Sequence, residues 1–382
     1  CRNFDTAKST LMLYFDHSAT TPIHPDVLNF MNSIQVKVYG NPSSIHEQGR
    51  KAKAIIEKAR SQVARAIGTK SNQIIFTGGG SEANNQILWS ILNWNKKHII
   101  ASEIEHPAIT KVLEKLVYFD IDSNLASVDQ FGQISVKNLQ ALMREDTGLI
   151  TVMLANNEVG TIQPIRKIVQ LAHEKDILVH TDAVQCLGKM PINVKVLGVD
   201  FLSLSAHKFY GPKGIGILYF KNKASLASFI IGGGQESGLR AGTENIASIA
   251  GMGLAAELAT TRLEKHIQNL EEFETQFKTG LMSFFPKAII NGDEKNKLPG
   301  LVSVSFPGYR SDILLAKLDR ANLAVSSGSA CGAGEVKPSS VLYAMGLNDE
   351  TNISTLRFSF GASNTIEQID LLLAELNTIL SD

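Results

Sequence analysis

Short apolar runs alternate with helix-like segments along the middle of the chain. The runs are rich in β-branched and aromatic residues and read QIIFT, HIIAS, LITVML, ILVHTD, FLSLS and GIGILYF. Helix-like stretches such as PIRKIVQLAHEK separate several of them. Apolar strands that alternate with helices are typical of a mainly parallel sheet covered on both faces. We therefore expect an α/β fold over roughly residues 44–255.

The segment SSIHEQGRKAKAIIEKARSQVARAIG predicts a helix at the start of this block. Ser44 followed three residues later by Glu47 has the form of a capping box, and Gly68 ends the run. Between them the apolar residues recur at helical spacing, at Ala52, Ile55, Ile56, Ala59, Val63 and Ile67.

The pattern changes after residue 257. Residues 258–283 predict one long amphipathic helix, followed by LVSVSF, LLAKLDRANLAVSS, LRFSF and a closing helix. We expect two domains: a large one over 14–257, and a small α+β domain over 258–382 that carries Cys331. The segment up to about residue 24 is expected to pack with the small domain.

Composition narrows the class of protein. Among 382 residues, 37 basic side chains balance 37 acidic ones, so we expect no nucleic-acid binding. No apolar run approaches the ~20 residues that a membrane span needs, and we expect no signal peptide. Three widely spaced cysteines, Cys1, Cys186 and Cys331, fit neither a disulfide framework nor a metal site. They fit a reducing cytoplasm.

A glycine-rich turn follows the first predicted strand. IIFTGGGSEANNQILW runs from strand to three glycines, then Ser81 and a helix. Glycines let a backbone approach a ligand closely, and a helix N-terminus offers free N–H groups to a phosphate. The alternative is a plain tight turn between strand and helix.

Two later strands also end in polar residues. ILVHTDAVQ ends on Asp182, with Gln185 three residues later, and ligands of α/β sheets bind at the carboxyl ends of strands. FLSLSAHKFYGPKGIG ends in Ser205, His207 and Lys208. A lysine buried there has a lowered pKa and a nucleophilic amine. The alternatives are that Asp182 caps a helix and that Lys208 is a solvated surface lysine.

A phosphate cradle, an acid and a lysine on separate strand ends together suit pyridoxal phosphate (PLP). Its phosphate needs the helix N-terminus, its ring nitrogen a carboxylate, and its aldehyde the lysine. The combination is far more specific than any single feature.

Ten motifs in order resemble the cysteine desulfurases of the IscS/NifS type, which are fold-type-I PLP enzymes of the class V aminotransferase group. The resemblance spans about residues 13–380. The motifs are YFDHSATTP, YGNPSSIHEQGRKA, FTGGGSEANN, EHPAI, ANNEVGTIQP, HTDAVQ, SLSAHKFYGPKGIG, GGGQESGLRAGTEN, SSGSAC and LRFSFG.

The resemblance implies a role for each motif residue. Lys208 would hold PLP covalently, Asp182 would pair with the ring nitrogen, and His106 would stack on the ring and move protons. Cys331 would take sulfur from L-cysteine, which leaves a persulfide and L-alanine. The remaining binding residues would be Gly80, Ser81, Ser205 and His207 at the phosphate, Gln185 and Asn157 at the ring oxygen, Arg357 with Asn157 at the substrate carboxylate, and Thr243 reaching the phosphate from a second subunit of a homodimer.

Each role has a structural alternative. His106 could start a helix, Arg357 could make a surface ion pair, and Asn157 could stabilise a turn. Cys186 is expected to be a small packed residue rather than a second nucleophile. After Cys331 the relatives commonly have Thr or Ser, whereas this chain has Gly332 and Gly334.

Three functions are consistent with the chain. The first is a cysteine desulfurase that passes persulfide sulfur to an acceptor protein, for iron–sulfur cluster assembly or other thio-cofactor synthesis. The second is a selenocysteine lyase or another class V PLP enzyme. The third is a degenerate scaffold without activity. Cys331 favours the first over the second, since transamination needs no thiol, and intact Lys208, Asp182 and His106 speak against the third.

Overall fold

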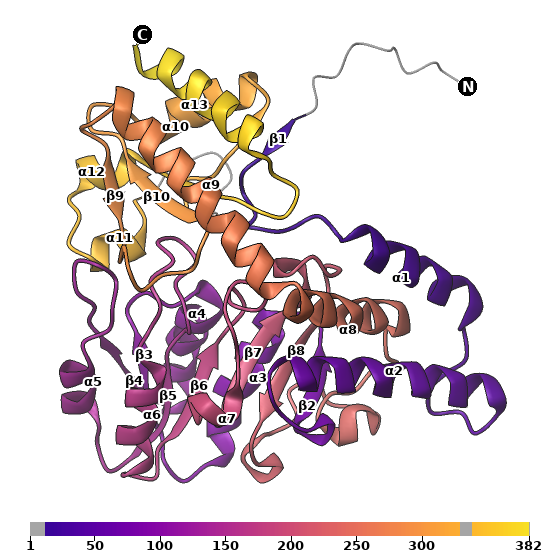
Figure 1. The fold of residues 1–382 in the computed structure, drawn as a ribbon. Helices are drawn as coiled ribbons and strands as arrows, with labels where there is room; N and C mark the ends of the chain where they lie inside the picture. Colours follow the sequence, from indigo (N-terminus) through magenta and orange to yellow (C-terminus); the bar gives the residue numbers. More distant parts are fainter. Residues whose placement is uncertain (1–11, 329–337, 382) are drawn as a thin grey trace.

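The computed structural model describes residues 12–328 and 338–381, so the predicted nucleophile Cys331, Gly332, Gly334 and Cys1 lie outside the described residues. A seven-stranded sheet of order β2-β8-β7-β6-β5-β3-β4 forms the centre of the larger part (Figure 1). Its strands are β2 (Ile74–Thr77), β3 (His98–Ser102), β4 (Asp122–Ala126), β5 (Thr147–Thr151), β6 (Leu178–Asp182), β7 (Phe201–Ser205) and β8 (Gly216–Phe220).

The sheet is mainly parallel. β8 runs antiparallel to its two neighbours, β2 and β7, and every other neighbouring pair is parallel. The predicted α/β fold is therefore confirmed. The sequence does not predict β4, DSNLA, which lies at the edge of the sheet. Only Ala126 of this strand is buried. Its other positions need not be apolar, so the sequence shows no apolar run there.

Helices cover both faces of this sheet. Ile74 and Phe76 of β2 pack in one apolar core with α2, α6 and α8, whereas Ile75 packs in a second core with α3 and α4. This division follows from the alternation of side chains along a strand. The helices of this part are α1 (Pro25–Lys37), α2 (Glu47–Ala66), α3 (Gly80–Ser90), α4 (Pro107–Leu116), α5 (Val136–Leu142), α6 (Ile165–His173), α7 (Val194–Leu197) and α8 (Ile246–Thr261). Single 3-10 turns are η1 (Ser71–Gln73), η2 (Ile91–Asn93), η3 (Val117–Phe119), η4 (Ala206–Lys208), η5 (Lys223–Ser225) and η6 (Gln235–Gly238).

The smaller part has its own sheet and core. β10 (Leu301–Ser305) lies between β9 (Ile289–Asn291) and β12 (Thr355–Ser359), antiparallel to both. Helices α9 (Leu263–Phe284), α10 (Ser311–Arg320) and α13 (Ile366–Ser381) pack on it around an apolar core rich in phenylalanine. Two short helices, α11 (Ser340–Ala344) and α12 (Asp349–Ile353), precede β12.

The N-terminal segment joins this smaller part. β1 (Leu13–Tyr14) pairs in parallel with β11 (Leu323–Ala324), and Phe15 is buried in the phenylalanine core. The chain then crosses to α1 at the larger part (Figure 1). Residues 16–21 therefore run between the two parts, beside the active-site residues described below.

The predicted capping box is wrong. α2 begins at Glu47, and its N-cap is His46, whose Nδ1 accepts a hydrogen bond from the backbone N–H of Gly49 at 3.2 Å. Ser44 stays in the preceding turn, where its N–H bonds to the carbonyl of Asn41. The helix starts later than predicted because a histidine supplied the acceptor that the motif assigns to serine.

The predicted single helix over 258–283 is also wrong. Its first residues belong to α8, and α9 starts after Arg262, where φ is −106° and ψ is 9°. The hydroxyls of Thr260 and Thr261 bond back to the carbonyl of Glu257. Such hydroxyl bonds compete with the helical ladder and bend helices. Among the described residues, no helix has the length and apolarity to cross a bilayer.

Candidate active site

The glycine turn lies between β2 and α3. Gly79 is the N-cap, with φ of 151°, and no side chain caps the helix. A Cβ on Gly80 would lie 2.7 Å from Cγ2 of Val184, so the turn sits tightly against the segment that follows β6. Ser81 begins the exposed side of α3. The uncapped N–H groups of this eleven-residue helix are available to an anion.

Asp182 is buried at the end of β6. Its Oδ2 accepts a hydrogen bond from Nδ2 of Asn84 at 2.6 Å, and its Oδ1 accepts one from the N–H of Val184 at 2.9 Å. The second bond closes a local turn. It is not the helix cap of the alternative interpretation, because the next helix, α7, begins only at Val194. The first joins Asp182 to α3. Sequence reasoning did not single out Asn84, although the residue lies one helical turn after Gly80 and so faces the same sheet edge.

Lys208 lies just beyond β7, in η4. Its Nζ donates hydrogen bonds to the carbonyl oxygens of Ser18 at 2.6 Å and Ala19 at 2.7 Å. Burial, with the positive charges of Arg357 and Lys189 nearby, lowers the pKa of Lys208 to about 7. The residue is not a solvated surface lysine, and a large part of its amine is uncharged at neutral pH.

Three further predicted binding residues lie around this lysine. Nε2 of Gln185 donates to the same Ser18 carbonyl at 3.0 Å. His207 is half-buried, its Nδ1 is 3.1 Å from Oγ1 of Thr20, and burial with Lys208 and Lys213 nearby lowers its pKa to about 4. Ser205 is buried, with its Oγ 3.9 Å from where a Cβ on Gly79 would lie.

His106 caps α4 at its N-terminus. Its Nδ1 accepts a hydrogen bond from the N–H of Ala108 at 3.0 Å, so a neutral ring carries its proton on Nε2. Burial lowers the pKa of His106; Asp182 opposes this effect and Lys208 adds to it. The residue is both a helix-start histidine and a neighbour of the two site charges. Glu105 beside it is buried, and burial raises its carboxyl pKa well above the usual range.

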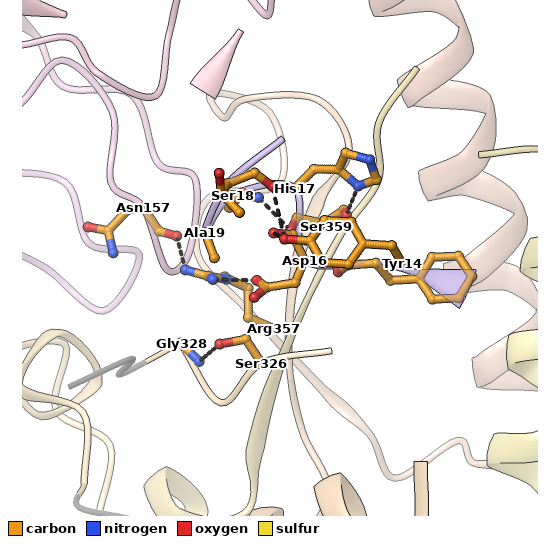
Figure 2. Close-up of polar contacts among 12 residues, drawn as sticks. Tyr14, Asp16, His17, Ser18, Ala19, Asn157, Ser326, Gly328, Arg357 and Ser359 are labelled. Carbon is orange, nitrogen blue, oxygen red and sulfur yellow. Dashed lines mark hydrogen bonds and ion pairs between the residues drawn. The ribbon is translucent and has the colours of Figure 1, made fainter. Parts of the chain in front are cut away.

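Arg357 reaches the site from β12 of the smaller part. Figure 2 shows its Nη1 donating to the backbone carbonyl of Asn157 at 2.9 Å and its Nη2 paired with Oδ1 of Asp16 at 2.7 Å. The contact with Asn157 is made by its main chain, not its side chain. Asp16 lies in the quoted motif YFDHSATTP, but nothing in its spacing assigned it a partner.

Thr243, Cys331 and Cys186 remain of the residues that the sequence analysis discussed. Thr243 is exposed on a loop that Gln235 holds through a hydrogen bond from the N–H of Gly242 at 3.1 Å. Cys331 lies outside the described residues. Cys186 is fully buried in the core, and burial raises its thiol pKa, as suits the packed residue that was expected.

A sequence model of the family described as aminotransferase class-V matches residues 13–372. The chain belongs to the aminotransferase class-V family. Enzymes of this family are PLP-dependent, which agrees with the lysine, acid and glycine turn gathered at one edge of the sheet.

Relatives within this family cover almost the whole chain. The chain is 41% identical over 371 residues to a protein named cysteine desulfurase IscS from Dictyoglomus turgidum, which covers 96% of the chain and 94% of the relative. It is 42% identical over 373 residues to a protein of the same name from Clostridium botulinum strain Hall, with coverage of 96% and 94%. A solved structure titled NifS-like protein superposes with a TM-score of 0.92 at 36% identity, covering 97% of this chain and all of that one.

The residues present fit the cofactor of a class V aminotransferase. Among the described residues, buried polar atoms without a hydrogen-bond partner include Oε1 of Gln185, Oδ1 of Asn84 and Nε of Arg357. Buried polar atoms without partners are rare, so their gathering around Lys208 and Asp182 indicates a polar ligand. The glycine turn supplies the anion site that the phosphate of PLP needs.

Proposed function

We propose that the chain is a PLP-dependent cysteine desulfurase that converts L-cysteine to L-alanine and passes the sulfur to Cys331. One observation carries the proposal. The weakly basic amine of Lys208 lies near the guanidinium of Arg357 and the buried carboxylate of Asp182, and Asp182 is bonded to Asn84 of α3, whose start is uncapped. This set can hold a phosphorylated aldehyde and an amino acid together. The names of the relatives agree with this function.

The cofactor contacts follow from the chemistry of each group. When bound, PLP supplies an electron sink for bonds at the substrate α-carbon. Lys208 holds its aldehyde and Asp182 its ring nitrogen. Its remaining polar groups are bound by residues around them: the phosphate by Gly80, Ser81, Ser205 and His207, and the ring oxygen by Gln185 and Asn157.

Arg357 binds the substrate carboxylate together with Asn157. Its Nε has no partner, while Asp16 and the Asn157 carbonyl hold the other end of the guanidinium. A guanidinium that two partners hold in one orientation, and that keeps a buried N–H without a partner, is suited to orient a planar carboxylate.

Proton transfers fall to Lys208 and His106. The uncharged Nζ of Lys208 can accept the substrate α-proton because its pKa is near 7. Nε2 of His106 is free of the helix cap and can exchange protons with the substrate thiol. The Cys331 thiolate then attacks the substrate sulfur: an S–S bond forms, and the Cβ–S bond breaks with its electron pair left on carbon. Cβ takes the proton given up by the substrate thiol, and Lys208 returns the α-proton to Cα, which gives alanine.

A homodimer completes this proposal. Thr243 is exposed on its own subunit and would reach the phosphate of the second one. Tyr39, Ile45 and Ile231 are 78%, 91% and 87% exposed, and such apolar side chains on a protein surface suit a subunit contact. We further propose the domain division 14–257 and 258–382, a cytoplasmic location, and an acceptor protein in iron–sulfur cluster assembly or other thio-cofactor synthesis.

The test is to incubate the PLP-loaded protein with L-cysteine and to measure alanine and sulfide. Lys208→Ala should lose the absorbance of the covalently bound cofactor. Cys331→Ala should keep that absorbance and stop sulfur release, while Cys186→Ala, the matched control in the core, should stay active. Wild-type desulfuration by Cys331→Ala would refute the proposed nucleophile. Release of selenium from L-selenocysteine by the wild-type protein, without release of sulfur from L-cysteine, would point to a selenocysteine lyase.

A further inference from the structure

The turn after β5 is fixed by its own side chains. Oδ1 of Asn156 accepts hydrogen bonds from the N–H groups of Glu158 at 2.8 Å and Val159 at 3.0 Å, and its Nδ2 donates to the carbonyl of Ile104 at 3.1 Å. Asn156 is fully buried. The backbone of this turn is therefore held in one conformation, close to the segment that carries His106.

Glu158 of this turn contacts both flanks of the Cys331 segment. Its carboxylate is 9% exposed, and its Oε2 accepts a hydrogen bond from Oγ of Ser339 at 2.6 Å. A Cβ on Gly328 would lie 3.1 Å from the same oxygen. Gly328 and Ser339 stand on either side of residues 329–337, which lie outside the described residues. One carboxylate oxygen thus lies beside the chain on both sides of the segment.

Both flanking positions are held in place by further bonds. The N–H of Gly328 donates to Oγ of Ser326 at 3.2 Å (Figure 2), and the N–H of Ser339 donates to Oδ1 of Asn352 at 2.7 Å. Oγ of Ser339 also caps α11. These partners belong to the smaller part. The Glu158 bond links Ser339 to the larger part, beside the apolar packing of Val341 and Leu342 on Ile104 and Val159.

We propose that Glu158 is a positioning residue for sulfur transfer. It holds Ser339 after the Cys331 segment by a hydrogen bond and lies against Gly328 before it, on the turn that also binds Arg357. The inference rests on the proposed function. Arg357 donates to the carbonyl of Asn157, the residue next to Glu158. The same turn therefore lies beside Arg357, which binds the substrate carboxylate, and beside the residues on both sides of the Cys331 segment. Fixing both ends of a segment raises the effective concentration of a group within it at the site.

The test separates substrate binding from sulfur transfer. Glu158→Ala should slow the first-turnover formation of alanine and of Cys331 persulfide about tenfold, as expected for loss of a buried hydrogen bond. The affinity for L-cysteine, followed by the cofactor absorbance in a Cys331→Ala background, should change by less than about twofold. Glu158→Gln, which keeps an acceptor for Ser339, should retain most of the rate.

Two matched variants complete the experiment. Ser339→Ala should slow the first turnover as Glu158→Ala does, and the double variant should be no slower, because both remove one interaction. Ser340→Ala, one residue along and exposed, should have no effect. If Glu158→Ala fails to fold, Ser339→Ala carries the test. A wild-type first turnover in either variant, or an equal loss of cysteine affinity, overturns the inference. Continued alanine formation by Cys331→Ala alone would instead overturn the proposed function.

Discussion

The amine of Lys208 should react at neutral pH, because its site keeps the amine uncharged. With a pKa of about 7, about nine-tenths of the amine is neutral at pH 8, whereas a lysine with the ordinary pKa of about 10.4 is about 0.4% neutral. The neutral fraction is therefore about 200 times larger. Burial is the largest cause of this shift, ahead of the charges of Arg357 and Lys189.

Competitive labelling measures this pKa directly. The protein, freed of PLP, is treated with a trace of acid anhydride between about pH 5 and pH 10, and each lysine peptide is quantified by mass spectrometry. The labelling of Lys208 is divided by its own maximum at high pH, because partial burial lowers its rate at every pH. The scaled curve should have its midpoint near pH 7. The exposed Lys58 provides the comparison within the same sample.

A substitution tests the cause of the shift. Arg357→Gln removes one of the two nearby positive charges, so the midpoint for Lys208 should rise, though by less than the shift that burial alone causes. Lys58→Gln should leave the midpoint unchanged. If labelling of Lys208 rose only near pH 10, the usual range of a lysine side chain, the assignment of an uncharged amine to the site would be refuted.

Three other predictions follow from buried contacts. Arg60→Met should lower the free energy of unfolding in urea by about 3–5 kcal/mol, because it leaves the carboxylate of Glu236 buried without the 2.6 Å ion pair; an unchanged midpoint would contradict this. Gly80→Ala should weaken PLP binding because its Cβ would meet Val184 at 2.7 Å, and adding Val184→Ala should restore binding if the clash is the cause. Asp182→Asn should retain the cofactor but slow turnover by about 10- to 100-fold, as measured by alanine release, and a wild-type rate would exclude a charged contact there.

The apolar pattern predicted the architecture because a parallel sheet buried on both faces needs apolar strands. Such runs predicted every strand of the central sheet except β4. β4 was missed because an edge strand can be polar, and its residues apart from Ala126 are not buried. The break at Arg262 was missed because α8 and α9 adjoin, and hydrophobic periodicity alone does not register a bend.

The sequence predicted only those site residues that directly follow a strand of the central sheet. Lys208 and Asp182 each follow a strand of one sheet, so the fold itself brings them to one edge. Asp16, Asn84 and Glu158 lie on a loop, a helix and a turn, and their partners are distant in sequence. No local pattern predicts such contacts. The contacts of Asp16 and Glu158 depend on how the smaller part packs against the larger one, and that of Asn84 depends on how α3 packs on the central sheet.

The segment 16–21 sets the distance between the two halves of the site. Asp16 holds Arg357 of the smaller part. The carbonyls of Ser18 and Ala19, two and three residues further along the chain, hold Lys208 of the larger part. Two residues of extended chain span at most about 7 Å. The substrate carboxylate site and the cofactor lysine are therefore linked by a short piece of backbone as well as by domain packing. A movement of the smaller part that changed this distance would first have to break the contacts of Asp16 or of Lys208.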